Sequence, residues 1–130
     1  MSVAEKRTLP RIPVHLAVRI DIILVDQMRR HIVLEAHLHD MHEQGCRAEA
    51  RLSSDVCDML KKGKYEAEID FRGRQGLPEK VYARNVWLAE KQDGKGRHVK
   101  MGFQFAECPA THADAIRQFL EHSEMLYDVD

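Results

Sequence analysis

Most of this chain alternates apolar and polar residues with a period of two, and this alternation constrains its fold more than any other feature. From Pro13 to Leu24, apolar side chains occupy every second position, with polar residues such as Arg19 and Asp21 between them. Such alternation is typical of a β-strand with one buried face. The pattern recurs in residues 32–38, 46–52, 65–71, 81–89 and 99–105. The sequence therefore predicts six strands.

Turn and helix signals separate these strands. Gly73 and Gly76 mark one turn, and the Gln-Asp-Gly-Lys-Gly segment of residues 92–96 predicts a hairpin, because Asp-Gly tolerates positive backbone angles. A helical turn is predicted from the capping segment 53–55 to Leu60, ended by Gly63.

The C-terminal segment predicts a helix. Thr111 and Asp114 have the spacing of a capping box. Apolar residues at helical spacing follow them, namely Ile116, Phe119, Leu120 and Tyr127. Because closure of a sheet removes exposed strand edges, we predict a mainly β fold, a six-stranded antiparallel β-barrel with a C-terminal α-helix. This unit spans residues 13–130, and the aperiodic residues 1–12 form a flexible N-terminal arm.

Composition limits the function. A chain of 130 residues suits one domain, and 20 Lys and Arg against 21 Asp and Glu give a net charge of −1, which argues against a nucleic-acid binder. The three cysteines have neither zinc-ribbon spacing nor an even count, which favours reduced thiols in a cytoplasm. No apolar stretch approaches the ~20 residues of a membrane span. We expect a soluble, cytoplasmic protein that does not insert into membranes.

Two short motifs suggest a binding site. Arg7 and Arg11 lie four residues apart on the arm, and each guanidinium offers a planar fork of donors that matches phosphate or the O6/N7 edge of guanine. Asp40 opens the segment Asp-Met-His-Glu-Gln-Gly, which ends at Gly45 and follows the second predicted strand. Its carboxylate accepts hydrogen bonds, which suits the donors of a guanine.

The order of these motifs resembles that of the PilZ family of cyclic di-GMP receptors. The resemblance includes Val86-Trp87 and the Gly-Phe-Gln-Phe segment of residues 102–105, and covers the chain from Lys6 to about Leu120. It implies that Arg7 and Arg11 clamp guanine edges and phosphates, that Asp40 accepts from guanine, and that Gly45 allows a sharp turn. It also implies a barrel that binds cyclic di-GMP on its outer surface.

Four further positions enter this prediction. His42 stands where the family motif has Ser, and an imidazole could clash, stack on guanine or pair with phosphate. Trp87 either lies near the guanine bases or is an ordinary tryptophan of the core or barrel surface. Lys6 and Arg47 either add phosphate contacts or are ordinary solvated charges.

We expect a receptor and not an enzyme, because no nucleophile, base and orienting group assemble from recognisable motifs. No cofactor or metal is expected. As a monomer or weak dimer it would relay second-messenger signals to an unidentified effector protein, in motility, biofilm or surface-polysaccharide control. One alternative is a degenerate PilZ domain acting as a nucleotide-independent adaptor. Another is a metal-responsive barrel built on His37, His39, His42 and Cys46.

Overall fold

The computed structural model describes residues 12–24, 30–62, 65–92, 97–106 and 108–128. Six strands and two helices follow one another along the chain. The strands are β1 (Ile12–Leu24), β2 (His31–His42), β3 (Gly45–Leu52), β4 (Tyr65–Asp70), β5 (Lys80–Gln92) and β6 (Arg97–Phe105). The helices are α1 (Ser54–Lys62), between β3 and β4, and α2 (Ala110–Asp128), at the C-terminal end.

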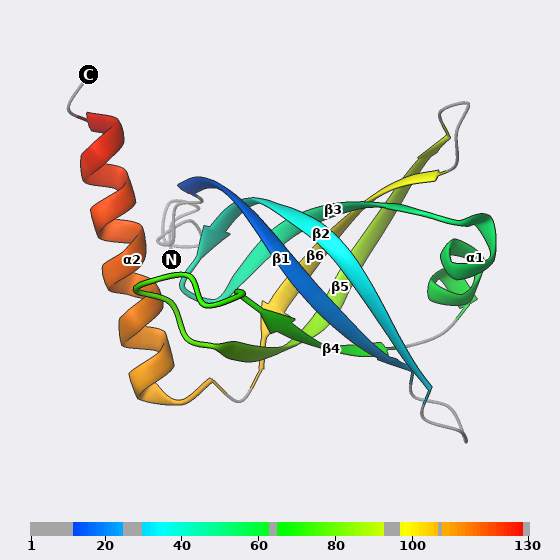
Figure 1. Cartoon of the computed structure of the whole chain (residues 1–130), viewed down its shortest axis with the longest axis horizontal. Coiled ribbons are helices and arrows are strands. Elements are labelled where there is room, and N and C mark those ends of the chain that lie inside the picture. Colours follow the sequence, from blue (N-terminus) through cyan, green and yellow to red (C-terminus); the bar gives the residue numbers. More distant parts are fainter. Residues whose placement is uncertain (1–11, 25–29, 63–64, 93–96, 107, 129–130) are drawn as a thin grey trace, which may run out of the picture.

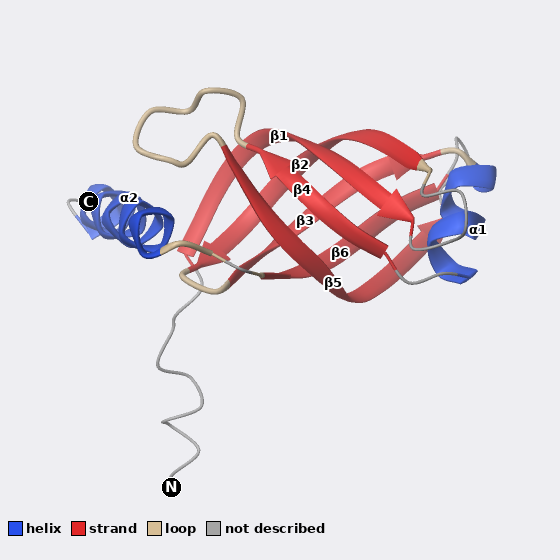
Figure 2. Cartoon of the chain, turned by 90° about the horizontal axis from the view of Figure 1, so that it is seen from below, coloured by secondary structure: helices blue, strands red, loops and turns tan. Residues whose placement is uncertain are grey.

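The strands form a closed antiparallel barrel in the order β1-β2-β3-β6-β5-β4. The predicted fold class is therefore confirmed. In Figures 1 and 2 the two helices lie at opposite ends of the barrel. The start of β1 and the turn between β2 and β3 lie at the end nearer α2 (Figure 1).

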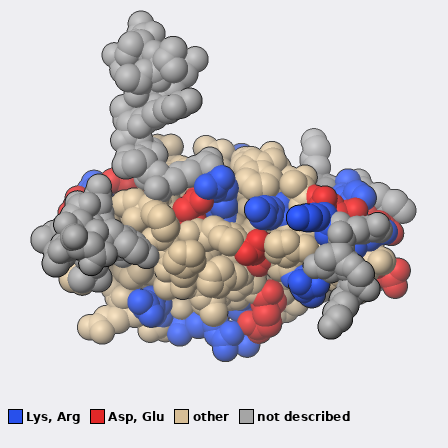
Figure 3. Space-filling view, turned by 90° about the horizontal axis from the view of Figure 1, so that it is seen from above, with Lys and Arg blue, Asp and Glu red and all other residues tan. Residues whose placement is uncertain are grey.

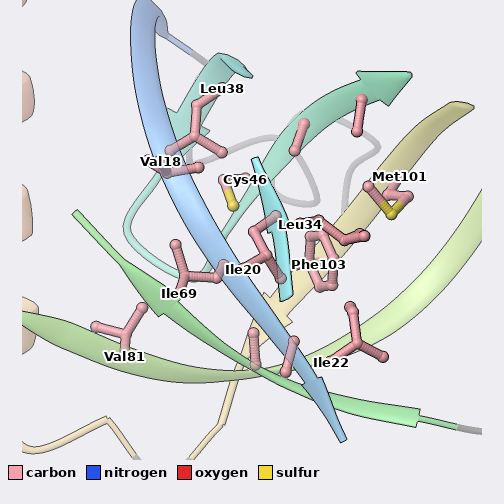
Figure 4. Packing of buried hydrophobic residues seen from close by; sticks show 14 of the residues in the cluster. Val18, Ile20, Ile22, Leu34, Leu38, Cys46, Ile69, Val81, Met101 and Phe103 are labelled. Carbon is pink, nitrogen blue, oxygen red and sulfur yellow. The ribbon is translucent and has the colours of Figure 1, made fainter. Parts of the chain in front are cut away.

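The barrel interior contains the apolar side chains of the alternating pattern. Val18, Ile20 and Ile22 of β1 are entirely inaccessible to solvent, and they belong to the same buried cluster as Met101 and Phe103 of β6 (Figure 4). Burial of such side chains is the main stabilising contribution to a fold of this kind, at about 1.5–3 kcal/mol for each large apolar side chain.

The start of α1 agrees with its predicted cap, whereas the start of α2 does not. Ser53 caps α1, because its Oγ accepts a hydrogen bond from the Val56 amide at 3.3 Å. The capping box predicted at Thr111 is wrong. The helix already begins at Ala110, where the Pro109 carbonyl accepts from two amides of the first turn, so Thr111 lies inside the helix. Asp114 pairs with Arg117 instead.

The arm boundary also shifts. Ile12, which the sequence placed in the arm, is the first residue of β1, is 8 % exposed and pairs with Met41. Its apolar side chain joins the core, so the strand starts one residue earlier than predicted. Neither described helix combines the length and apolar character required to cross a lipid bilayer.

Charged side chains are spread over the barrel surface. On the face seen in Figure 3, Lys and Arg lie among Asp and Glu and do not gather in one broad basic area.

Candidate functional site

A row of aligned residues crosses the outside of five strands at the α2 end of the barrel. Pairing places Pro13 of β1 opposite Asp40 of β2, and Asp40 opposite Arg47 of β3. Arg47 is opposite Gly102 of β6, which is opposite Trp87 of β5. We call these five residues the belt. It brings the predicted Asp40 and Trp87 into one continuous surface.

The belt lies between two rows of inward-facing residues. The number of residues between these two rows differs from strand to strand. Between the inward rows, β3 has one residue (Arg47), β2 has two (His39 and Asp40) and β1 has three (residues 13–15). The register shifts are β-bulges, and β5 has another between Asn85 and Trp87. Bulges redirect side chains and are common beside functional sites. Here the bulges place additional polar side chains on the outer surface, while the two rows of inward-facing residues stay in register.

Asp40 and Arg47 form an ion pair in the middle of the belt. Arg47 Nε donates to Asp40 Oδ2 at 2.6 Å, and Arg47 Nη2 contacts the same oxygen. The hydrogen bond to Asp40 raises the pKa of Arg47. Asp40 is only 5 % exposed and is the single buried charged residue among those described. Its Oδ1 has no hydrogen-bond partner within the described part of the chain. A buried acceptor without a partner is energetically costly, so a donor that reached this oxygen would stabilise the folded protein.

Trp87 lies over the backbone of Gly102. A Cβ atom at Gly102 would come within 2.1 Å of Trp87 Nε1, so only glycine permits this contact. Two hollows flank the Trp87 and Arg47 side chains. One, of about 180 Å³, also includes His42, Gln44 and Gln104, among other residues. The other, of about 380 Å³, includes Pro13, His15, His39, Asp40 and Lys100.

His42 has a defined role in the turn between β2 and β3. The Gln44 amide donates to His42 Nδ1 at 3.0 Å. A backbone N–H can only donate, so Nδ1 carries no proton here. A serine hydroxyl can accept from the amide two residues later in the same way. The imidazole therefore supplies a contact that a serine at this position could also supply.

Gly45 allows this turn to pack against β6. A Cβ atom at Gly45 would lie 2.2 Å from the Phe103 carbonyl oxygen. The turn is further fixed by the Phe105 amide, which donates to the Gln44 carbonyl at 2.7 Å. A glycine at this position is thus required by close approach of two backbones.

Three predicted ligand residues, Lys6, Arg7 and Arg11, lie outside the described residues. Arg11 is covalently joined to Ile12, whose partner in β2 is Met41, the neighbour of Asp40. The described part of the chain therefore begins one residue before the belt.

The four residues of the metal alternative do not converge. Cys46 packs in the core, where burial raises the pKa of its thiol, whereas His37 and His39 lie on the outer surface. His39 pairs with Glu49. Across the described ranges, no three His, Cys, Asp or Glu side chains are arranged to hold a metal ion.

Some site residues were missed or undervalued from the sequence. Arg47 is bound to Asp40 and is not simply a solvated charge. Gly102 was treated only as part of a pattern, although an isolated glycine inside a strand is itself a signal of close approach. His15 gave no recognisable signal, because bulges cannot be read from regular alternation, and His39 was considered only as a metal ligand.

The fold is that of PilZ domains. The chain superimposes on the PilZ domain of YcgR from Escherichia coli, determined with c-di-GMP, with a TM-score of 0.65, 18 % identity and 94 % of both chains covered. It also matches the PlzA protein of Borreliella burgdorferi in complex with c-di-GMP, with a TM-score of 0.58 and 9 % identity. That match covers 95 % of this chain and 55 % of PlzA. No protein-family model and no curated protein matches the sequence.

Proposed function

We propose that this protein is a receptor for cyclic di-GMP that binds its ligand along the belt. The observation that carries the proposal is Asp40, a buried carboxylate with one oxygen held by Arg47 and the other unpartnered among the described residues. Asp40 borders the larger hollow. Guanine presents N1–H and an exocyclic amine on one edge, and these donors suit an unpartnered carboxylate oxygen.

The surroundings of Asp40 fit the remaining parts of a guanine dinucleotide. The Trp87 indole is 38 % exposed and borders both hollows, so a purine can stack on it. Arg47 and Lys100 border the larger hollow and favour a phosphate. Arg7 and Arg11, with Lys6, would add the remaining guanidinium and ammonium contacts, as the sequence resemblance implies.

The structural neighbours support the same ligand, because both were determined with c-di-GMP. We propose a receptor and not an enzyme, because the sequence motifs do not assemble a nucleophile, a base and an orienting group. The bound state would be read by a partner protein in the cytoplasm, in motility, biofilm or polysaccharide control.

Titration of the purified protein with cyclic di-GMP tests the proposal. Trp87 is the only tryptophan, so its fluorescence should change on binding, and calorimetry should give the affinity and stoichiometry. Asp40→Ala should weaken binding by about 2–3 kcal/mol, because a charge-assisted contact is lost. Asp58→Ala is the matched control, since Asp58 pairs with Arg97 near α1, and its affinity should equal that of the wild type.

Absence of binding by the wild-type protein would reject the receptor. The adaptor alternative would then replace it, in which a partner protein contacts the barrel without nucleotide. Equal affinity in Asp40→Ala and wild type would keep the receptor but reject the belt as its site.

A further inference from the structure

His15 occupies an unusual position beside the belt. It lies in the bulge of β1, between Pro13 and Leu16, and its φ of 51° is in the left-handed region. Histidine is more common there than most residues, yet the conformation still has a cost for any side chain other than glycine. The bulge directs His15 outward, where its side chain is exposed and borders the same hollow as Asp40.

The charged and titratable groups around His15 come from three other strands, β2, β3 and β6. From β2, His37 has its ring centroid 5.8 Å from that of His15, and His39 and Asp40 border the same hollow. From β3 and β6, Arg47 and Lys100 border it. Glu49 of β3 forms ion pairs with His39 and with His98 Nε2, the latter at 2.8 Å.

An anion in this hollow would lie among cationic side chains. Arg47 and Lys100 border the hollow beside His15, and the Asp40 Oδ2 oxygen is already bound to Arg47. A negative charge bound next to an imidazole favours its protonated form, because opposite charges attract.

We infer that His15 is a further ligand-binding residue, which takes up a proton as the hollow receives a phosphate of the nucleotide. This inference rests on the proposed function and adds a pH dependence to it. A phosphodiester keeps its charge between pH 6 and pH 8, so the proton that is bound must come to the protein. Linkage then requires the affinity to rise as the pH falls, by at most about tenfold for each pH unit and one proton.

The experiment is calorimetric titration with cyclic di-GMP at pH 6, 7 and 8, in two buffers of different ionisation enthalpy. The difference between buffers gives the number of protons taken up with each ligand. We expect net uptake in the wild type and about tenfold tighter binding at pH 6 than at pH 8. His15→Asn tolerates the same backbone angle without titrating, so its uptake should vanish and its affinity should vary little with pH. His15→Lys should bind tightly at all three pH values.

A control variant separates His15 from a histidine outside the hollow. His31→Asn removes a histidine that pairs with Asp21 at 3.0 Å, away from the belt, and should keep the wild-type uptake. Binding without proton uptake, or equal uptake in His15→Asn, overturns the inference while leaving the receptor intact. No binding at any pH overturns the receptor and this inference together.

Discussion

The two ends of the barrel hold charged clusters of similar composition, but the clusters differ in what they leave unpaired. Near α1, Glu90 Oε2 accepts from the Cys57 thiol at 2.7 Å and lies 3.3 Å from both Lys61 Nζ and Arg97 Nη1. Arg97 also contacts Asp58 at 2.8 Å. At the belt, Asp40 is more deeply buried than any other described charge, and its Oδ1 has no described partner.

This difference separates a structural cluster from a candidate binding site. The acceptor near α1 is shared by three donors that tie α1 to β5 and β6, whereas Asp40 at the belt borders a hollow together with Arg47 and Trp87. The α1 cluster leaves one donor unused in the described structure, Arg97 Nε. The types of charged residue therefore do not distinguish a binding site from a structural cluster. A buried acceptor without a described partner, in a residue that borders a hollow, does distinguish them.

The largest expected effect is on the free energy of unfolding and concerns the turn between β2 and β3, beside the belt. Gly45→Ala should lower the free energy of unfolding by about 3 kcal/mol, because its Cβ would overlap the Phe103 carbonyl oxygen. Urea unfolding measures it. Gly73→Ala is the control, with a φ of 73° but no atom within 4 Å of its Cβ, and should lose only about 1 kcal/mol. Equal losses would show that the turn tolerates a side chain.

Substitutions in the N-terminal arm should change the affinity for the ligand but not the stability of the fold. Arg11→Ala, and likewise Arg7→Ala, should weaken cyclic di-GMP binding by about 2–3 kcal/mol through loss of a bidentate charged contact. Calorimetry gives the affinity, and thermal unfolding should give nearly the wild-type melting temperature. Arg72→Ala, which removes an exposed pair with Glu35, should bind normally. Unchanged affinity in the Arg11 variant would contradict the arm's assignment.

The turn residue His42 should be replaceable by an acceptor but not by an apolar side chain. His42→Ser should keep the affinity for cyclic di-GMP within about threefold, because the hydroxyl can accept from the Gln44 amide. His42→Val should lose about 1 kcal/mol of stability for the missing hydrogen bond. Urea unfolding and calorimetry on both variants test this, and equal behaviour of Ser and Val would show that the acceptor is unimportant.

The smallest effect is expected near α1 and is confined to acid. The hydrogen bond from Cys57, followed by those from Lys61 and the charge of Arg97, lowers the pKa of Glu90 from 4.5. A depressed pKa stabilises the folded state above pH 4.5, and that stability is lost as the pH falls through the folded-state value. Glu90→Gln should flatten the decline of the unfolding free energy below pH 4.5 and leave nucleotide affinity unchanged. A steeper decline in this variant would contradict the assignment.

Alternation predicted the strands and the core because burial of one face imposes a period of two. It could not predict the bulges, since Val14 continues the pattern in sequence while the chain around it leaves the regular register. Arg47 was undervalued for a related reason. Its pairing with Asp40 depends on register across the turn, and a sequence does not state register. Asp40 and Gly45 could be singled out from the sequence, because both belong to one short, recognisable motif.

The bulges also bear on how such a domain can diverge. Although β1 and β2 contain extra residues at the belt, the inward rows on either side of it remain paired between neighbouring strands. Substitutions on the belt need not be matched by compensating changes in the interior. A lineage could therefore exchange, retune or lose its ligand while inheriting the same barrel, which agrees with a shared fold at 18 % identity.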